Sequence, residues 1–239
     1  MTEEMFREDA TLRECSATVL ALTEGGVILD RSVFYPQGGG QAGDAGALLL
    51  ADGRRVTITD ARKSKEHPGA VLHLLADAAA SLLVPPGTPV TALIDWQRRH
   101  AHMRFHTSTH LLCALVPHPV DGCSITAAYA RLDFHMSEPL DKEALSAGIA
   151  RLVAEAHAVR QRWISEAELD ANPSLVRSMS VQPPRGLGRI RVLEIEGVDL
   201  QPCGGTHVAN TAEVGAVVVT KIEKKSAMTR RVVLGFRTD

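Results

Sequence analysis

Hydrophobic and polar side chains alternate in short runs through the first part of the chain, and glycines interrupt these runs. An alternation with a period of two is typical of β-strands that bury one face. It predicts strands over residues 15–23, 27–29, 47–50, 55–59 and 90–94. Residues 76–83 are predicted to form a short helix, which the prolines that follow would end. We therefore expect a small, mainly β N-terminal domain over residues 1–94.

Further along the chain, apolar residues recur at the spacing of a helix. This spacing predicts helices over residues 97–115 and 141–163. The apolar face of the second helix would consist of Leu145, Ile149, Leu152, Ala156 and Val159. A strand or hairpin is predicted over residues 124–135, and strands of one sheet over 190–195, 213–222 and 230–236. Residues 95–239 are therefore expected to form a mixed α/β domain, and the fold class of the whole chain is expected to be α+β.

The composition is that of an ordinary globular protein, with 239 residues of which 45% are hydrophobic and 23% charged. Four cysteines lie far apart, at Cys15, Cys113, Cys123 and Cys203, which is unlike a disulfide framework and indicates reduced thiols. We expect Cys113 and Cys123 to be small buried residues rather than ligands. The first residues lack a secretory signal, and no apolar run approaches the roughly 20 residues that a membrane span needs. A cytoplasmic protein with no membrane partner is therefore expected.

The formal net charge is −2, so the chain has no overall positive charge that would attract nucleic acid. Aromatic residues make up only 4% of the sequence, which argues against a surface that stacks several bases on several rings. Any binding of nucleic acid must therefore use a local group of residues.

Two pairs of residues have the spacing of metal ligands. His106 and His110 lie four residues apart, so a helix would direct both imidazoles to one side. Cys203 and His207 flank two glycines, which allow a tight turn that points both side chains the same way. Imidazoles and a thiolate suit zinc, a borderline-soft ion, whereas calcium and magnesium require oxygen ligands. We therefore expect about one zinc ion per chain.

Four segments of the sequence resemble the editing region of alanyl-tRNA synthetases. These segments are FYPQGGGQ (34–41), RFHTSTHLL (104–112), RLDF (131–134) and CGGTH (203–207). The resemblance runs nearly from end to end, and it is to the free-standing alanyl-tRNA editing proteins of the AlaX family, of the medium type with a glycine-rich N-terminal domain. The editing domain of threonyl-tRNA synthetase shares the two ligand pairs, but the glycine-rich segment and the sequence CGGTH favour the alanyl type.

The resemblance implies a hydrolase that acts in trans on the ester bond of mischarged tRNA(Ala), with zinc bound by His106, His110, Cys203 and His207. The expected substrate carries serine on its acceptor end, and glycine is a second candidate. Such a site can hydrogen-bond the seryl hydroxyl, whereas alanine would leave its polar groups unpaired. Two alternatives stay open: a zinc-dependent hydrolase of another aminoacyl or acyl ester, and a non-catalytic, zinc-stabilised tRNA-binding module.

The resemblance also implies a polar side chain that distinguishes serine from alanine. The family's Gln-x-Gly-Ser pattern appears here as Asp121-Gly-Cys-Ser124, which makes Asp121, Ser124 and Thr126 the candidates. A hydroxyl donor such as Ser124 or Thr126 is the better choice, because a carboxylate close to the metal would be drawn into coordination or water activation. Thr109, which lies between His106 and His110, is the next candidate.

Two groups of residues are expected to contact tRNA, as the resemblance implies. The first is the glycine loop, residues 34–41, whose backbone would approach the tRNA unless it serves only as a turn between the domains. The second is a basic cluster near the C-terminus, which would bind phosphates unless it only keeps a strand edge charged and solvated. The expected contacts are Gly38, Gly39, Gly40, Lys224, Lys225, Arg230 and Arg231.

Overall fold

The computed structural model describes residues 1–23, 25–179, 182–183, 185–186 and 188–237. The chain divides into two compact units. The first unit consists of Met1–Gly38 and Ala42–His100, and the second of Gly39–Gln41 and Ala101–Asp239. The end of the glycine loop therefore belongs to the second unit.

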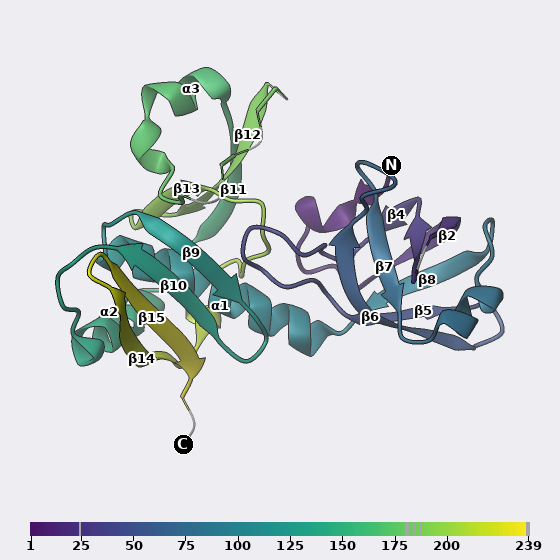
Figure 1. Cartoon of the computed structure of the whole chain (residues 1–239), viewed down its shortest axis with the longest axis horizontal. Coiled ribbons are helices and arrows are strands. Elements are labelled where there is room, and N and C mark those ends of the chain that lie inside the picture. Colours follow the sequence, from purple (N-terminus) through teal and green to yellow (C-terminus); the bar gives the residue numbers. More distant parts are fainter. Residues whose placement is uncertain (24, 180–181, 184, 187, 238–239) are drawn as a thin grey trace. The chain divides into compact units, whose positions relative to one another are not determined.

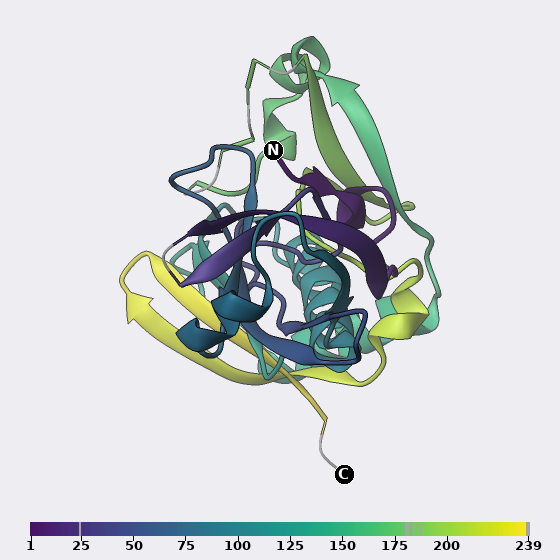
Figure 2. The ribbon, with the colours of Figure 1, turned by 90° about the vertical axis from the view of Figure 1, so that its right-hand side faces the viewer.

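Strands of the first unit close into a barrel in the order β2-β3-β7-β6-β5-β8 (Figure 1). Their bounds are β2 (Glu14–Thr23), β3 (Gly26–Leu29), β5 (Gly46–Leu49), β6 (Arg55–Lys63), β7 (Val71–Leu75) and β8 (Pro89–Ile94). A short parallel pair, β1 (Glu3–Glu4) and β4 (Arg31–Ser32), accompanies the barrel. The predicted helix over 76–83 is a 3-10 helix, Ala78–Leu83, and another covers Met5–Arg7. Figure 2 looks onto the strands of this unit, coloured purple to blue.

A buried ion pair holds the segment that follows β4. Neither Arg99 nor Asp44 has an exposed side chain, and Arg99 Nε donates to Asp44 Oδ2 at 3.0 Å. Arg99 also donates to the carbonyl of Val33 at 2.6 Å, while Asp44 accepts from the backbone N–H of Tyr35 at 2.7 Å. Burial raises the pKa of Asp44, and the charge of Arg99 opposes that rise. The pair therefore fixes the backbone of the loop on both sides of Tyr35.

The second unit contains a four-stranded antiparallel sheet in the order β14-β15-β10-β9 and a three-stranded sheet in the order β11-β12-β13. The strands are β9 (Val120–Ile125), β10 (Ala130–His135), β11 (Val159–Ser165), β12 (Arg189–Ile195), β13 (Asp199–Pro202), β14 (Val217–Ser226) and β15 (Thr229–Phe236). The helices are α1 (Trp96–Leu115), α2 (Lys142–Ala154) and α3 (Glu166–Ala171), with 3-10 helices over Pro173–Leu175 and Thr211–Val214. Figure 1 and Figure 2 both place α3 away from the β14–β15 hairpin.

Side-chain contacts hold α1 and α2 against the four-stranded sheet. The rings of Phe105 on α1 and Phe236 on β15 stack with centroids 4.2 Å apart. Ser146 on α2 accepts from the backbone N–H of Val219 on β14 at 3.1 Å. Helix α1 begins in the first unit, where Asp95 accepts from its first turn, and continues into the second unit. It carries the predicted histidine pair, and it confirms the helix predicted over 97–115.

The helix predicted over 141–163 is wrong in its second half. Helix α2 ends at Ala154, Ala156 adopts a φ of 54°, and the chain continues as β11. Val159, which was expected on the apolar helix face, pairs instead with Ile195 of β12. A second difference concerns the strand predicted over 213–222, because a 3-10 helix occupies Thr211–Val214 and β14 starts later. The prediction that 190–195 shares one sheet with 213–222 and 230–236 is also wrong, because β12 pairs with β11 and β13 instead of with β14 or β15.

In the part of the chain that the structure describes, no helix combines the length and the apolar character needed to cross a bilayer.

Candidate metal centre

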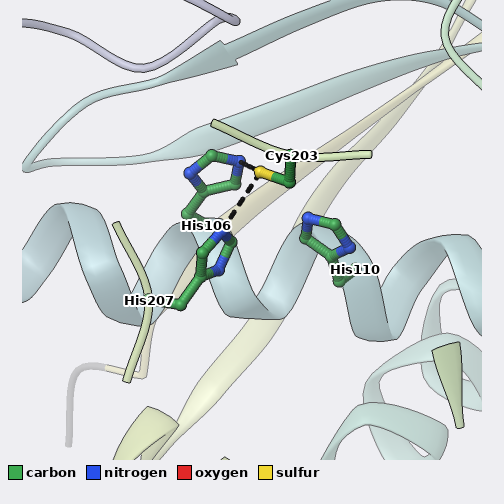
Figure 3. A group of neighbouring side chains, drawn as sticks. All are labelled: His106, His110, Cys203 and His207. Atoms are coloured by element: carbon green, nitrogen blue, oxygen red, sulfur yellow. Dashed lines mark hydrogen bonds between the residues drawn. The ribbon is translucent and has the colours of Figure 1, made fainter. Parts of the chain in front are cut away.

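Helix α1 presents the two histidines of the first pair on consecutive turns. His106 and His110 are 5% and 6% exposed, so both imidazoles lie in the interior of the second unit. The segment after β13 brings Cys203 and His207 to the same place (Figure 3). Gly205 allows this close approach, since a Cβ there would lie 2.1 Å from His106 Cε1. A glycine is therefore required between the second pair of ligands.

The four side chains form one cluster whose candidate ligand atoms all lie within 4.8 Å of one another. Cys203 Sγ is 3.5 Å from His106 Nε2 and 3.2 Å from His207 Nε2, as the dashed lines in Figure 3 mark. Zinc with bonds of about 2.0–2.1 Å to nitrogen and about 2.3 Å to sulfur separates tetrahedral ligand atoms by about 3.3–3.7 Å. The donor set of three imidazoles and one thiol suits such an ion, and the two sulfur–nitrogen separations are close to these values.

Each imidazole of the cluster has a hydrogen-bonding partner at its Nδ1 atom. His106 Nδ1 donates to Gln41 Oε1 at 2.8 Å, and His110 Nδ1 donates to Asp199 Oδ2 at 2.8 Å. His207 Nδ1 lies 3.3 Å from the hydroxyl of Thr107. Partners of this kind fix the tautomer and the orientation of a metal-binding histidine. They leave the Nε2 atoms available for a cation.

Further contacts hold these partners in turn. Gln41 Nε2 donates to the hydroxyl of Thr206 at 2.9 Å, and its Oε1 accepts from the Thr206 backbone N–H at 3.1 Å. The side chain of Gln201 donates to both carboxylate oxygens of Asp199, at 3.0 and 2.9 Å. The metal ligands therefore sit within a buried polar network whose members restrict one another.

Charges within the cluster favour a thiolate. Burial alone would raise the pKa of Cys203, but the neighbouring imidazoles of His106 and His207 outweigh it and hold that pKa well below the usual value. Burial lowers the pKa of His207 well below its usual range. For His110, burial also acts to lower the pKa, but hydrogen bonds to Asp199 and Cys203 prevail and raise it to about 10. The cluster therefore holds a favoured thiolate beside a protonated His110, and a zinc ion bound there would displace the proton from His110 Nε2.

The other two cysteines of this unit lie outside the cluster. Cys113 is 5% exposed, and burial raises its pKa to about 12. Burial, followed by the nearby Cys203, raises the pKa of Cys123 to about 12 as well. Both thiols therefore stay protonated, in keeping with the expectation that they are not ligands, although Cys123 is only partly buried.

The structure does not bring three of the predicted specificity residues into the cluster. The Asp121 carboxylate contacts two residues that are not ligands: its Oδ2 lies 3.3 Å from His135 Nδ1 and 3.4 Å from the Thr229 hydroxyl. The hydroxyl of Thr126 closes an exposed turn by donating to the Tyr129 carbonyl at 3.0 Å.

The third of these residues, Ser124, pairs with Arg131 on one face of the β9–β10 hairpin. Its neighbour Cys123 pairs with the buried Leu132 on the other face. Successive side chains of a strand point to opposite faces, so the face that carries Cys123 is the inner one and Ser124 points outwards.

Thr109 is the predicted specificity residue nearest to the ligands in the sequence, on the same helix as His106 and His110. It is 4% exposed and sits one residue before His110 on α1. Its hydroxyl donates to the carbonyl of His106 at 2.7 Å, which leaves the oxygen able to accept a further hydrogen bond.

The basic cluster divides into exposed and engaged members. Lys224 and Lys225 are exposed on the β14–β15 hairpin. Arg230 is 8% exposed and donates to the carbonyls of Ser226 and Ser137.

Arg231, the last member of the basic cluster, forms a two-pronged ion pair with Asp133, at 2.7 and 2.8 Å. Both arginines therefore hold the hairpin to its neighbours, Arg230 through the Ser137 carbonyl and Arg231 through Asp133.

The glycine loop ends in a conformation that other residues would strain. Gly39 and Gly40 have φ angles of 57° and 84°. A Cβ on Gly40 would lie 2.9 Å from Cys123 Sγ, and the Gly40 carbonyl accepts from the backbone N–H of Ile125 at 2.8 Å. These contacts place the following residue, Gln41, next to His106. Gly38 belongs to the first unit, where its carbonyl accepts from Tyr35 at 2.8 Å.

Sequence reasoning assigned no role to the residues that support the ligands. Gln41 is 65 residues from His106 in the sequence, and Asp199 is 89 residues from His110. The only signal for Gln41 was its place at the end of the glycine loop, and Asp199 had no spacing that linked it to a ligand. Partners at such separations become visible only when the fold is known.

Two known families match parts of the chain. Residues 190–233 match the family described as the threonyl and alanyl tRNA synthetase second additional domain. Residues 6–98 match the family described as class II (A) tRNA synthetases. Together the matches cover segments from both compact units.

Individual relatives match over nearly the whole chain. An alanyl-tRNA editing protein AlaX-M from Methanosarcina mazei is 33% identical over 97% of this chain and 95% of that protein. One from Saccharolobus solfataricus is 32% identical over 97% of this chain and 98% of that protein. The alanine–tRNA ligase of Pyrococcus furiosus is 34% identical over 93% of this chain, which corresponds to 24% of the ligase. From these alignments and the ligand geometry, the chain belongs to the AlaX-M family of alanyl-tRNA editing proteins.

Proposed function

We propose that this protein hydrolyses the ester bond of mischarged tRNA(Ala) in trans, with seryl-tRNA(Ala) as its main substrate and glycyl-tRNA(Ala) as a second one. The observation that carries the proposal is the convergence of His106, His110, Cys203 and His207 in a chain that belongs to this family. In the reaction, a water oxygen bonds to the ester carbonyl carbon and the bond from that carbon to the ribose oxygen breaks. The products are the free amino acid and tRNA with a free terminal hydroxyl.

We propose zinc as the ion that the four residues bind, one per chain, in the cytoplasm. A bound zinc ion would polarise the ester carbonyl and lower the pKa of water. The chain's own contribution is to hold the ligands. Gln41 and Asp199 keep protons on Nδ1 of His106 and His110, and Gly205 allows the backbone to pass close to His106. This network is formed before substrate arrives, so little reorganisation is needed.

Thr109 is the residue best suited to recognise the seryl hydroxyl. Its hydroxyl proton is donated to the carbonyl of His106, so its oxygen can accept a hydrogen bond from the serine side chain. Alanine has no such donor and loses this contact. The partners of Asp121 and Thr126 on the hairpin supply no comparable support for those two residues. Ser124 stays a candidate only if the substrate reaches the outer face of the hairpin.

Phosphate contacts are proposed for the exposed part of the basic cluster, Lys224 and Lys225. Arg230 and Arg231 contribute by fixing the hairpin that carries these lysines, since their guanidinium groups are bound to carbonyls and to Asp133. Contacts to phosphate orient the substrate and carry no information about the amino acid. For Gly38, Gly39 and Gly40, an approach to the tRNA backbone stays a proposal as well.

The experiment that tests the function is a deacylation panel with seryl-, glycyl- and alanyl-tRNA(Ala), each with zinc-loaded protein and without protein. We expect rapid release of serine, slower release of glycine and alanine release close to the uncatalysed rate. Equal release of all three, together with hydrolysis of small esters in the absence of tRNA, would favour a general ester hydrolase. Tight tRNA binding without any release would favour a binding module.

A further inference from the structure

One face of the β11-β12-β13 sheet turns towards the metal centre. Asp199 of β13 lies on that face, because its carboxylate accepts from His110. Asp199 pairs with Ile195 of β12, and side chains of directly paired residues and of residues two apart share a face. Arg191, four residues before Ile195, therefore lies on the same face. Trp163 of β11 pairs with Arg191 and shares it too.

At the outer end of this face, a tryptophan and an arginine form an exposed pair. The side chain of Trp163 is 48% exposed, and the guanidinium carbon of Arg189 lies 4.5 Å from the centre of its ring. Arg189 is two residues before Arg191, on the same face of β12. Aromatic rings and guanidinium planes are the groups on which unpaired RNA bases stack. We call Trp163 and Arg189 the stacking pair.

Arg191 connects the stacking pair to the metal ligands. Its Nη1 donates to the carbonyls of Cys203 at 2.7 Å and Gly205 at 3.1 Å. The backbone N–H of Cys203 in turn donates to the Arg191 carbonyl at 3.2 Å. Cys203 and Trp163 thus lie on either side of Arg191, two strand spacings or about 10 Å apart along the sheet. That span suits the base and the ribose ester of a single nucleotide.

We propose that the stacking pair binds the base of the 3′-terminal adenosine of the tRNA acceptor end, while the ester on its ribose lies at the metal centre. This assignment rests on the proposed function, because the ester substrate is what brings that nucleotide to the cluster. The acceptor end of tRNA is single-stranded, so its last base is free to stack. Arg189 and Arg191 add positive charge beside the ring, as a nucleotide with its phosphate requires.

A fluorescence titration tests the stacking directly. The protein has two tryptophans, so Trp96→Phe leaves Trp163 as the single reporter. We expect uncharged tRNA(Ala) with its complete CCA end to quench this fluorescence in a saturable way. The same tRNA without its terminal adenosine should bind but quench far less. Equal quenching by both tRNAs, or none by either, would overturn the assignment.

Kinetics of seryl-tRNA(Ala) deacylation give an independent test. Loss of one stacked base costs about 5- to 150-fold in binding, so Trp163→Leu should raise KM by that factor and lower kcat much less. Trp163→Phe should restore most of the binding, because it keeps a ring. Tyr129→Leu is the matched control, since Tyr129 is a 40% exposed aromatic residue in the turn between β9 and β10, away from the three-stranded sheet.

The outcomes separate this assignment from the function on which it rests. If the wild-type protein releases serine but Trp163→Leu has an unchanged KM, the stacking pair does not bind the substrate and the proposed function stands. If the wild-type protein releases no serine, the proposed function fails, and quenching by uncharged tRNA still tests the adenosine site. An equal loss in Trp163→Leu and Trp163→Phe, with zinc lost from both, would mean a purely structural role and would overturn the assignment.

Discussion

At the scale of single residues, the spacing of residues in the sequence predicts the metal ligands. It does not predict the side chains that hydrogen-bond to those ligands. His106 and His110 are predicted because residues four apart lie on the same side of an α-helix. Cys203 and His207 are predicted because the two glycines between them allow a tight turn. The four side chains do converge. The partner of His106, Gln41, comes from a loop in a distant part of the chain, and no local rule links the two.

Gln41 should therefore control how tightly the cluster holds its ion. Replacing Gln41 with Leu removes the acceptor at His106 Nδ1, and loss of such a partner typically weakens metal binding about 10- to 100-fold. Competition with a chelator of known affinity measures the change. Gln37→Leu is the matched control, because Gln37 lies in the same loop with an exposed side chain. Equal zinc affinity in both variants would contradict the role given to Gln41.

Thr109 should set the preference for serine. A neutral hydrogen bond contributes about 0.5–1.5 kcal/mol, so Thr109→Val should lower the ratio of seryl to alanyl deacylation rates about 2- to 13-fold. Zinc content should not change, since Thr109 is not a ligand. Thr126→Val serves as the comparison, because its hydroxyl closes an exposed turn. A ratio that falls in Thr126→Val and not in Thr109→Val would return the assignment to the hairpin.

At the scale of secondary-structure elements, a strong hydrophobic periodicity predicts that a helix or strand is present. It does not predict at which residue that element ends. The helix α1 was predicted from its pattern, and the structure confirms it. The strand or hairpin predicted over 124–135 is confirmed for β10, but the hairpin begins earlier, at Val120. The predicted helix over 141–163 ran too far, because Val159 falls on the helical repeat and equally suits a strand. Its pairing with Ile195, 36 residues away, decides the matter and is not visible locally. Register likewise decides which face of β9 carries Ser124.

Strand β7 gives the barrel a pH-dependent stability. His73 on β7 has no exposed surface, and its Nε2 lies 2.7 Å from the hydroxyl of Ser32. Burial lowers the pKa of His73 from 6.5 to about 4. The unfolded chain therefore binds a proton at higher pH than the folded chain, and stability is lost as the pH falls from about 6.5 to about 4.

The loss expected from His73 alone is about 3 kcal/mol over that interval. The free energy of unfolding, measured by denaturant titration at pH 6.5 and pH 4, checks it. His73→Met should lose less stability over the same interval than the wild type, whereas His67→Gln, a change at an exposed histidine, should behave as the wild type does. The same pH dependence in His73→Met and wild type would show that another group is responsible.

The β14–β15 hairpin should contribute to tRNA affinity through its lysines. Lys224→Ala together with Lys225→Ala should weaken tRNA binding and lower the slope of log K against log salt by about 1 to 2, since each phosphate contact releases counterions. Hydrolysis in a single turnover at saturating protein should change little, because these contacts position the substrate.

The control for that double variant is Lys65→Ala with Lys142→Ala, which removes the same charge from exposed positions elsewhere. Arg230 and Arg231 are unsuitable probes, because their removal would break contacts to Ser137 and Asp133 within the fold. An unchanged salt slope in the Lys224 and Lys225 variant would exclude both lysines from the binding surface.

At the scale of the whole molecule, composition limited the ways in which this protein can bind RNA. A net charge of −2 and few aromatic residues exclude a broad basic surface and a row of stacking rings. The structure offers instead small groups of residues, the exposed lysines of the hairpin and the stacking pair of Trp163 and Arg189. The composition indicates that any RNA-binding residues form small local groups. Strand register is needed to show which of these residues share a sheet face with the metal centre.

We propose that the cluster of His106, His110, Cys203 and His207 holds the ion with which this protein deacylates mischarged tRNA(Ala). The most direct measurement is the rate of serine release from seryl-tRNA(Ala) by zinc-loaded protein and by Cys203→Ala, with zinc content determined on both samples. We predict about one zinc per chain and rapid release for the wild type, and loss of both together for Cys203→Ala. Cys15→Ala, a change at a buried cysteine of the barrel, should keep both. Full activity of Cys203→Ala without bound metal would contradict the account.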